Sequence, residues 1–106
     1  ALDPSSLELY ERAVRWPWPS PSAHAHYGYA LGQQEQVEGS MRQMELALRG
    51  LDTGDLYYGL GAMALRLQDY AAAERWFEEC VYRWPSKAEA RELLERARRL
   101  RDEQGE

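Results

Sequence analysis

Apolar residues return along this chain every three or four positions, and no segment shows the sustained alternation of a β-strand. Near the C-terminus, an apolar stripe lies between charged residues, as in an amphipathic helix, and it consists of Ala90, Leu93, Leu94, Ala97 and Leu100. Proline, glycine and serine interrupt the pattern at intervals. We therefore predict an all-α fold of about six helices, at residues 5–16, 21–33, 36–49, 54–67, 70–83 and 87–103.

Local residue preferences mark some of the predicted helix starts independently of the apolar pattern. Ser20 followed by Pro21 is typical of a helix N-cap and first helical position, because proline fits where the amide has no helical partner. Asp69 precedes another predicted helix and is also a favoured N-cap. The connections are short, so neighbouring helices should run antiparallel.

Small and large residues recur in the chain at intervals of 33 or 34 positions. Gly28 and Gly61 are 33 apart, and a glycine inside a helix costs about 1 kcal/mol relative to alanine. Two glycines at matching positions therefore predict two places where paired helices cross closely. Three further sets follow the same interval: Ser6, Ser40 and Ala73; Tyr10, Met44 and Phe77; and Ala13, Ala47 and Cys80.

Residues 57–85 resemble one repeat of the tetratricopeptide (TPR) family. They contain Tyr57-x2-Leu60-Gly61-x2-Ala64, then Ala73-x3-Phe77, then Pro85, at the spacings of that 34-residue helix–turn–helix unit. The preceding copy is weaker, because His24, Ser40 and Asp52 replace the usual aromatic residue, alanine and proline.

The resemblance implies an antiparallel helix-hairpin solenoid of about two and a half repeats in a single domain, 1–106. On this register, residues 5–20 are a half repeat, 21–53 and 54–86 are repeats, and 87–104 form a C-terminal capping helix. From the half repeat and the first residue, Ala1, we expect a fragment of a longer protein.

In the family, the first helices of successive repeats line a concave groove that receives an extended or helical peptide. Transferring that register predicts that Tyr29, Gln33, Tyr58, Leu65 and Arg66 line a partner-binding groove. The tyrosines offer large amphipathic surfaces, and Arg66 can bind a carboxylate through its planar fork. The alternative is that the tyrosines pack against neighbouring helices.

The segment Trp16-Pro17-Trp18-Pro19-Ser20-Pro21 alternates proline with other residues. Proline removes amide donors and favours an extended conformation, so we expect a stiff connection whose tryptophans cover the core. The alternative is that Trp16 and Trp18 form an exposed aromatic knob for a partner.

Other kinds of site find little support in the sequence. A net charge of −5 argues against nucleic acid as a partner. His24 and His26 lie two positions apart, on different faces of a helix, so no metal site is expected. Cys80 occupies a small-residue position, and we expect a buried, inert thiol. We found no catalytic set, no cofactor motif and no apolar run of the ~20 residues that a membrane span needs.

The sequence thus favours a non-catalytic scaffold for protein–protein interaction or assembly, with a protein or peptide as partner. One alternative is a soluble TPR tail of a bacterial membrane or envelope enzyme, such as a surface-polysaccharide polymerase or ligase. In that case the membrane would be contacted only by other parts of the parent chain. Another alternative is self-association into a homo-oligomer. The sequence does not indicate a compartment, cytoplasmic or periplasmic.

Overall fold

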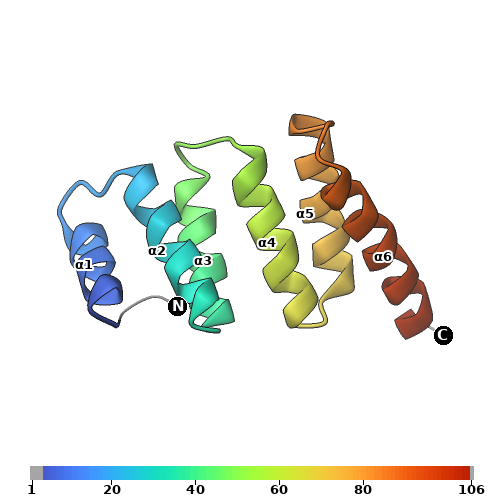
Figure 1. Ribbon diagram of the computed structural model, residues 1–106, viewed down its shortest axis with the longest axis horizontal. Coiled ribbons are helices and arrows are strands. Elements are labelled where there is room, and N and C mark those ends of the chain that lie inside the picture. Colours follow the sequence, from blue (N-terminus) through green and yellow to red (C-terminus); the bar gives the residue numbers. More distant parts are fainter. Residues whose placement is uncertain (1–3, 106) are drawn as a thin grey trace. The chain divides into compact units, whose positions relative to one another are not determined.

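The described part of the chain, residues 4–105, is built from α-helices alone in the computed structural model. Side chains are described from Leu7 onward. This confirms the predicted all-α fold, and every helix end lies within about two residues of the predicted one. The helices are α1 (Pro4–Arg15), α2 (Pro21–Gln33), α3 (Val37–Ala47), α4 (Gly54–Arg66), α5 (Tyr70–Arg83) and α6 (Ala88–Gly105) (Figure 1).

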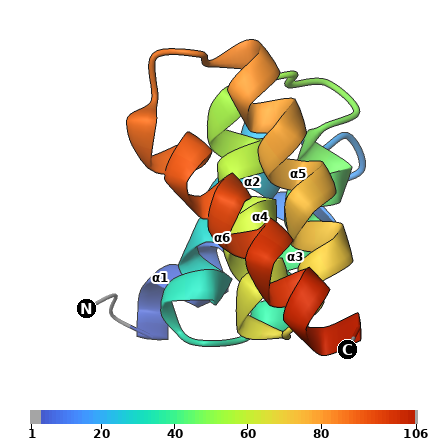
Figure 2. The ribbon, with the colours of Figure 1, turned by 90° about the vertical axis from the view of Figure 1, so that its right-hand side faces the viewer.

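The helices belong to two compact units, Ala1–Asp52 and Thr53–Glu106. In the first unit, α2 and α3 form a helical hairpin and α1 packs against α2. In the second unit, α4 and α5 form the hairpin and α6 packs alongside α5 (Figure 2). Each unit therefore consists of one hairpin and one additional helix.

The predicted caps are present at the starts of α2 and α5. Ser20 adopts an extended conformation and its hydroxyl accepts a hydrogen bond from the amide of Ala23, at 3.1 Å, with Pro21 as the first helical residue. The Asp69 carboxylate likewise accepts from the amide of Ala72, at 3.2 Å. These bonds satisfy amides that have no partner within the helix.

The turn of each hairpin contains one residue in the left-handed conformation, at matching positions of the two hairpins, which the sequence did not indicate. Glu35 has a φ of 62° and Gln68 a φ of 59°, and these two residues are 33 positions apart. Each occupies the position after the helix where glycine is usual in a Schellman motif. In the first hairpin the amide of Glu35 donates to the carbonyl of Gly32 and that of Gln36 to Leu31. In the second, the amide of Gln68 donates to Leu65 and that of Asp69 to Ala64, and all four bonds are 2.9 to 3.1 Å long.

Close helix crossings occur at the two predicted glycines. A Cβ atom on Gly28 would lie 2.9 Å from Cγ of Met44, and one on Gly61 would lie 2.7 Å from a ring carbon of Phe77. Both distances are shorter than real Cβ contacts allow. The expectation that each glycine removes a clash across a helix pair is therefore confirmed. In the first hairpin, the buried Ser40 hydroxyl also donates to the carbonyl of Gly28 at 2.6 Å.

The recurring small residues are buried in the two hairpins but not in α1. Ala47 and Cys80 have no exposed surface. Ala13, 34 positions before Ala47, is exposed, and Tyr10 is half-buried, with its ring stacked on His26 at 6.1 Å. Within the described residues, the small-residue position is therefore buried in α3 and α5 but exposed in α1.

Helix α6 covers the second hairpin with its apolar stripe, as predicted. Ala90, Leu94 and Ala97 are buried, whereas most of the remaining surface is charged and exposed. The Glu74 carboxylate of α5 pairs with Arg98, at 3.2 Å, and with Arg101. These ion pairs add to the apolar contact between α5 and α6.

Candidate functional site

The residues predicted to line a groove divide between the two units. Tyr29 and Gln33 lie on α2 in the first unit, four positions and thus about one turn apart. Tyr29 is half-buried and Gln33 is exposed. A half-buried tyrosine and an exposed side-chain amide are suited to contact a peptide, because they supply apolar area and hydrogen-bonding groups together.

In the second unit, Tyr58, Leu65 and Arg66 lie on α4, with Arg66 in its last turn. Tyr58 and Leu65 are seven positions apart, so they share one face of the helix, and both are half-buried. Arg66 is exposed. The second unit therefore combines two partly accessible apolar side chains with a cation at one end.

Tyr58 also has a packing role within its own unit. Its ring meets Phe77 edge-on, with the centroids 5.9 Å apart and the planes at 71°. The Lys87 ammonium lies 4.7 Å from the Tyr58 centroid and 4.3 Å from that of Trp84. Lys87 is thus a neighbour of the predicted site that sequence reasoning missed. Nothing in the sequence placed Lys87 beside Tyr58, although it is the single lysine of the chain.

The prediction that Trp16 and Trp18 cover the core is wrong, since 67% of Trp16 and 84% of Trp18 is exposed. The reason lies at the end of the first hairpin, where Pro21 packs directly onto Gly50 and leaves no room for a Cβ there. Pro21, rather than an indole, thus lies against Gly50 at this end of the hairpin. In the second unit the half-buried Trp84 does meet the start of α4, at Gly54.

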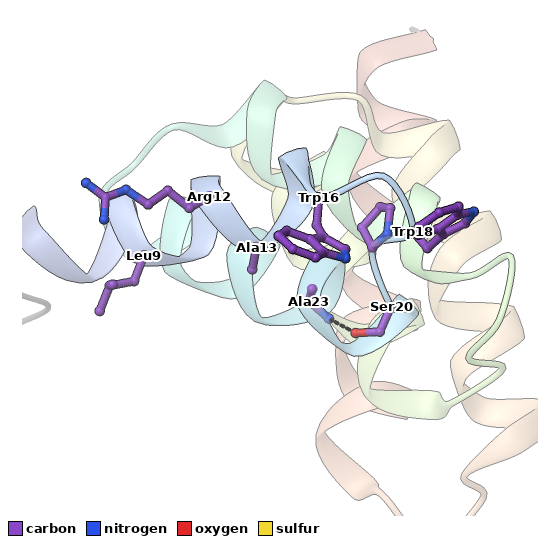
Figure 3. Close-up of a pocket in the computed structure, with 8 residues that line it drawn as sticks. Leu9, Arg12, Ala13, Trp16, Trp18, Ser20 and Ala23 are labelled. Carbon is purple, nitrogen blue, oxygen red and sulfur yellow. Dashed lines mark hydrogen bonds between the residues drawn. The ribbon is translucent and has the colours of Figure 1, made fainter.

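The exposed tryptophans border a surface hollow of about 450 Å³ beside α1. Leu9 and Ala13 are four positions apart and share one face of α1, and Trp16, just after the helix end, lines the same hollow. We call these three residues the open side of α1. Figure 3 shows Trp16 in the middle of the set, with Leu9 toward one end and Trp18 at the other. The hollow is also lined by Arg12, Trp18, Pro19, Ser20 and Ala23.

The two histidines have separate partners, as their spacing predicted. Nδ1 of His24 lies 2.7 Å from Oε1 of Gln43 on α3, whereas His26 stacks on Tyr10 of α1. Among residues 4–105, no three His, Cys, Asp or Glu side chains are grouped as a metal ion would require.

Cys80 is fully buried and free. Burial raises the pKa of its thiol, Lys87 opposes this rise, and Asp55 adds to it. A buried thiol with a raised pKa carries little thiolate at neutral pH and is a poor nucleophile. The side chain therefore contributes packing volume.

Within the described residues, no helix has both the length and the apolar character that crossing a membrane requires. Comparison of the chain with models of known protein families finds no match, and comparison with curated proteins finds no relative.

Proposed function

We propose that this chain is a divergent tetratricopeptide module that binds a peptide or helix of another protein and performs no catalysis itself. The observation that carries the proposal is the repetition of one hairpin design at an interval of 33 residues. Gly28 faces Met44 in the first hairpin as Gly61 faces Phe77 in the second. Stacked units of this kind usually serve as binding surfaces.

Each unit has its own proposed binding surface, which is the accessible side of the first helix of its hairpin. On α2 it comprises Tyr29 and Gln33, and on α4 it comprises Tyr58, Leu65 and Arg66. Partly exposed tyrosines are effective contact residues, because they bury much area while losing few rotamers. Arg66 favours a ligand that carries a carboxylate, since its guanidinium can donate two parallel hydrogen bonds.

The proposal is tested by selecting peptides from a displayed library on the full chain and measuring their dissociation constants. Replacing Arg66 with Ala should weaken the selected peptides about tenfold, which corresponds to ~1.4 kcal/mol of binding free energy. Tyr29→Ala and Tyr58→Ala should have similar effects, because they remove the apolar contact area. Circular dichroism spectra and melting temperatures should show that each variant remains folded.

The matched control is Arg99→Ala, which removes an exposed arginine from α6. It should leave the dissociation constants unchanged. The Tyr58→Ala result is interpreted together with that of Arg66→Ala, because Tyr58 also packs on Phe77. Selected peptides that bind all three variants as tightly as the original chain would rule out this surface.

A further inference from the structure

Two aromatic rings and a carboxylate surround the single lysine of the chain at one end of the second unit. The start of α4 and the connection from α5 to α6 both lie at this end (Figure 1). The Lys87 ammonium nitrogen is 4.7 Å from the centroid of the Tyr58 ring and 4.3 Å from that of Trp84. It also lies 3.3 Å from Oε2 of Glu89. We call Tyr58, Trp84 and Glu89 the ammonium site.

The chemistry of the ammonium site suits a compact cation that carries N–H donors. The faces of aromatic rings attract a cation within about 6 Å of the centroid. The Glu89 carboxylate, in the first turn of α6, accepts a charge-assisted hydrogen bond from an ammonium group. The exposed Asp55 stands one turn before Tyr58 on α4 and adds a second negative charge. A primary ammonium group meets all of these features.

The repeated hairpin design does not require rings at these two positions. Ala25 and Leu51 stand 33 positions before Tyr58 and Trp84, at the interval that relates Gly28 to Gly61. Ala25 is buried, so the first hairpin packs around a small side chain where the second has a tyrosine. The ring pair is therefore a feature of the second unit that the hairpin itself does not need.

Lys87 also differs from the other cation that meets a ring at this end. The guanidinium carbon of Arg83 is 4.3 Å from the centroid of the Tyr57 ring, and the same group pairs with Glu79, one turn earlier on α5. Lys87 instead belongs to the connection before α6, and 21% of its side chain is exposed. Tyr58 and Trp84 are half-buried, so the ammonium site is reachable from solvent.

We propose that the ammonium site binds a lysine side chain of a protein partner, and that Lys87 fills the site until the partner displaces it. The inference rests on the proposed function, because Tyr58 belongs to the binding surface on α4. The exchange leaves the charge at the site unchanged, since one primary ammonium group leaves the rings and Glu89 for water and another takes over its contacts. Accessible cation–π contacts are weak, so a ligand with further contacts along α4 displaces Lys87.

The distance to Arg66 adds a second feature to the partner segment. Arg66 follows Tyr58 by eight positions on α4, which corresponds to ~12 Å along the helix axis. An extended peptide advances about 3.3 Å per residue. A lysine in the ammonium site and a carboxylate at Arg66 are therefore about four residues apart in such a peptide.

The ammonium site is tested on the full chain with n-butylammonium chloride, which reproduces the end of a lysine side chain. Lys87→Ala vacates the site, and n-butylammonium should then shift the Trp84 indole signal in ¹H–¹⁵N NMR spectra, saturably and with a dissociation constant on the order of 10–100 mM. The unchanged chain should bind at least about threefold more weakly, because the tethered Lys87 competes. The uncharged 1-butanol should cause no saturable shift.

Two further variants are matched to Lys87→Ala. Lys87→Met keeps a long unbranched side chain between the rings but no charge, so the site stays filled and n-butylammonium should not bind. Adding Glu89→Gln to Lys87→Ala should weaken binding, and Glu89 is exposed, so the fold should be retained. An unshifted Trp84 signal in the Lys87→Ala chain, or equal binding by the Lys87→Met chain, would overturn the ammonium site.

A measurement on the unchanged chain avoids any dependence on a folded variant. The Cε protons of Lys87 lie beside two rings, so their NMR signals should be displaced from those of a solvated lysine. Addition of n-butylammonium should move them toward the solvated position, because Lys87 leaves the site. Signals that stay in place up to molar concentrations of n-butylammonium would show that Lys87 is not displaceable.

The partner's lysine is tested with a peptide that is selected on the unchanged chain and carries a lysine four residues from a glutamate. Norleucine in place of that lysine should weaken binding about fivefold. Lys87→Ala should tighten the lysine peptide about threefold and leave the norleucine peptide unchanged, because only the former competes with Lys87. A lysine that merely packs the connection would give no such gain.

The two titrations separate failure of this inference from failure of the proposed function. Binding of n-butylammonium without any lysine preference among bound peptides would assign the site to a free amine and refute the partner's lysine. A chain that binds no peptide at all would contradict the proposed function and, with it, the partner's lysine, while the n-butylammonium titration still decides whether the ammonium site exists.

Discussion

At the scale of single residues, two glycines set how closely the helices of each hairpin approach. Phe77 is fully buried, and three of its ring atoms lie within 2.8 Å of the place where a Cβ on Gly61 would be. The ring has no free space into which to move, because protein interiors are close-packed. Helix propensity alone favours alanine at this position, so the role of the glycine is to allow the close packing of Phe77.

Replacing Gly61 with Ala should therefore lower the free energy of unfolding, although alanine is the better helix former. Overpacking typically costs about 1–3 kcal/mol and the gain in helix propensity offsets about 1 kcal/mol, so we expect a net loss of up to ~2 kcal/mol. Urea denaturation followed by circular dichroism measures this difference. Gly39→Ala is the matched control, because its Cβ would make only ordinary contact, at 3.5 Å, and should stabilise the helix. A stabilised Gly61→Ala variant would contradict the close crossing.

Glu35 and Gln68 have positive φ, which residues other than glycine rarely adopt. Gln68→Gly should raise the free energy of unfolding by about 0.5–1 kcal/mol. The left-handed conformation costs a residue with a Cβ about 1–2 kcal/mol, and glycine avoids this cost. Part of the gain is offset because glycine has greater conformational freedom in the unfolded chain. The shift of the urea midpoint measures it. Gln68→Val should move the midpoint in the opposite direction. Equal midpoints for all three proteins would show that this turn is not strained.

At the scale of helices, α1 is held less firmly than the others. From Leu7 to Arg15 none of its side chains is fully buried, whereas α4 buries Leu56, Leu60, Gly61, Met63 and Ala64. Its contact within the first unit is with α2. Helices of this length are marginally stable by themselves, so the packing of α1 on α2 decides whether it stays folded.

We therefore expect amide hydrogen exchange in α1 to be at least about tenfold faster than in α4, because local opening of α1 exposes little apolar surface. Exchange measured by mass spectrometry or NMR on the full chain tests this expectation. Helix α6, which buries three side chains on α5, should fall between the two. Protection of α1 equal to that of α4 would mean that an additional contact holds it.

At the scale of the whole molecule, each unit pairs a glycine-centred hairpin with one more helix, and these two helices differ in chemistry. The open side of α1 is apolar, with Leu9, Ala13 and Trp16, whereas α6 directs charged side chains away from α5. Burial of the apolar side of α1 would therefore be favourable, whereas burial of the charged outer side of α6 would not.

The sequence was sufficient to predict the helices and the crossings, because periodicity, caps and paired glycines are local or evenly spaced signals. It did not reveal the left-handed turns, since neither Glu35 nor Gln68 carries the usual glycine signal. The exposure of Trp16 is a property of the tertiary structure, because no local residue signal decides whether a helix packs over its ring. The proximity of Lys87 to Tyr58 likewise arises from tertiary packing. The groove itself stays a prediction.

The location of the single cysteine has a consequence for how copies of this chain behave in oxidising conditions. Cys80 lies inside the second unit with no accessible surface. Two folded copies cannot bring their sulfur atoms into bonding distance. A disulfide-linked dimer can therefore form only after the second unit unfolds, and chains that stay folded form no such disulfide.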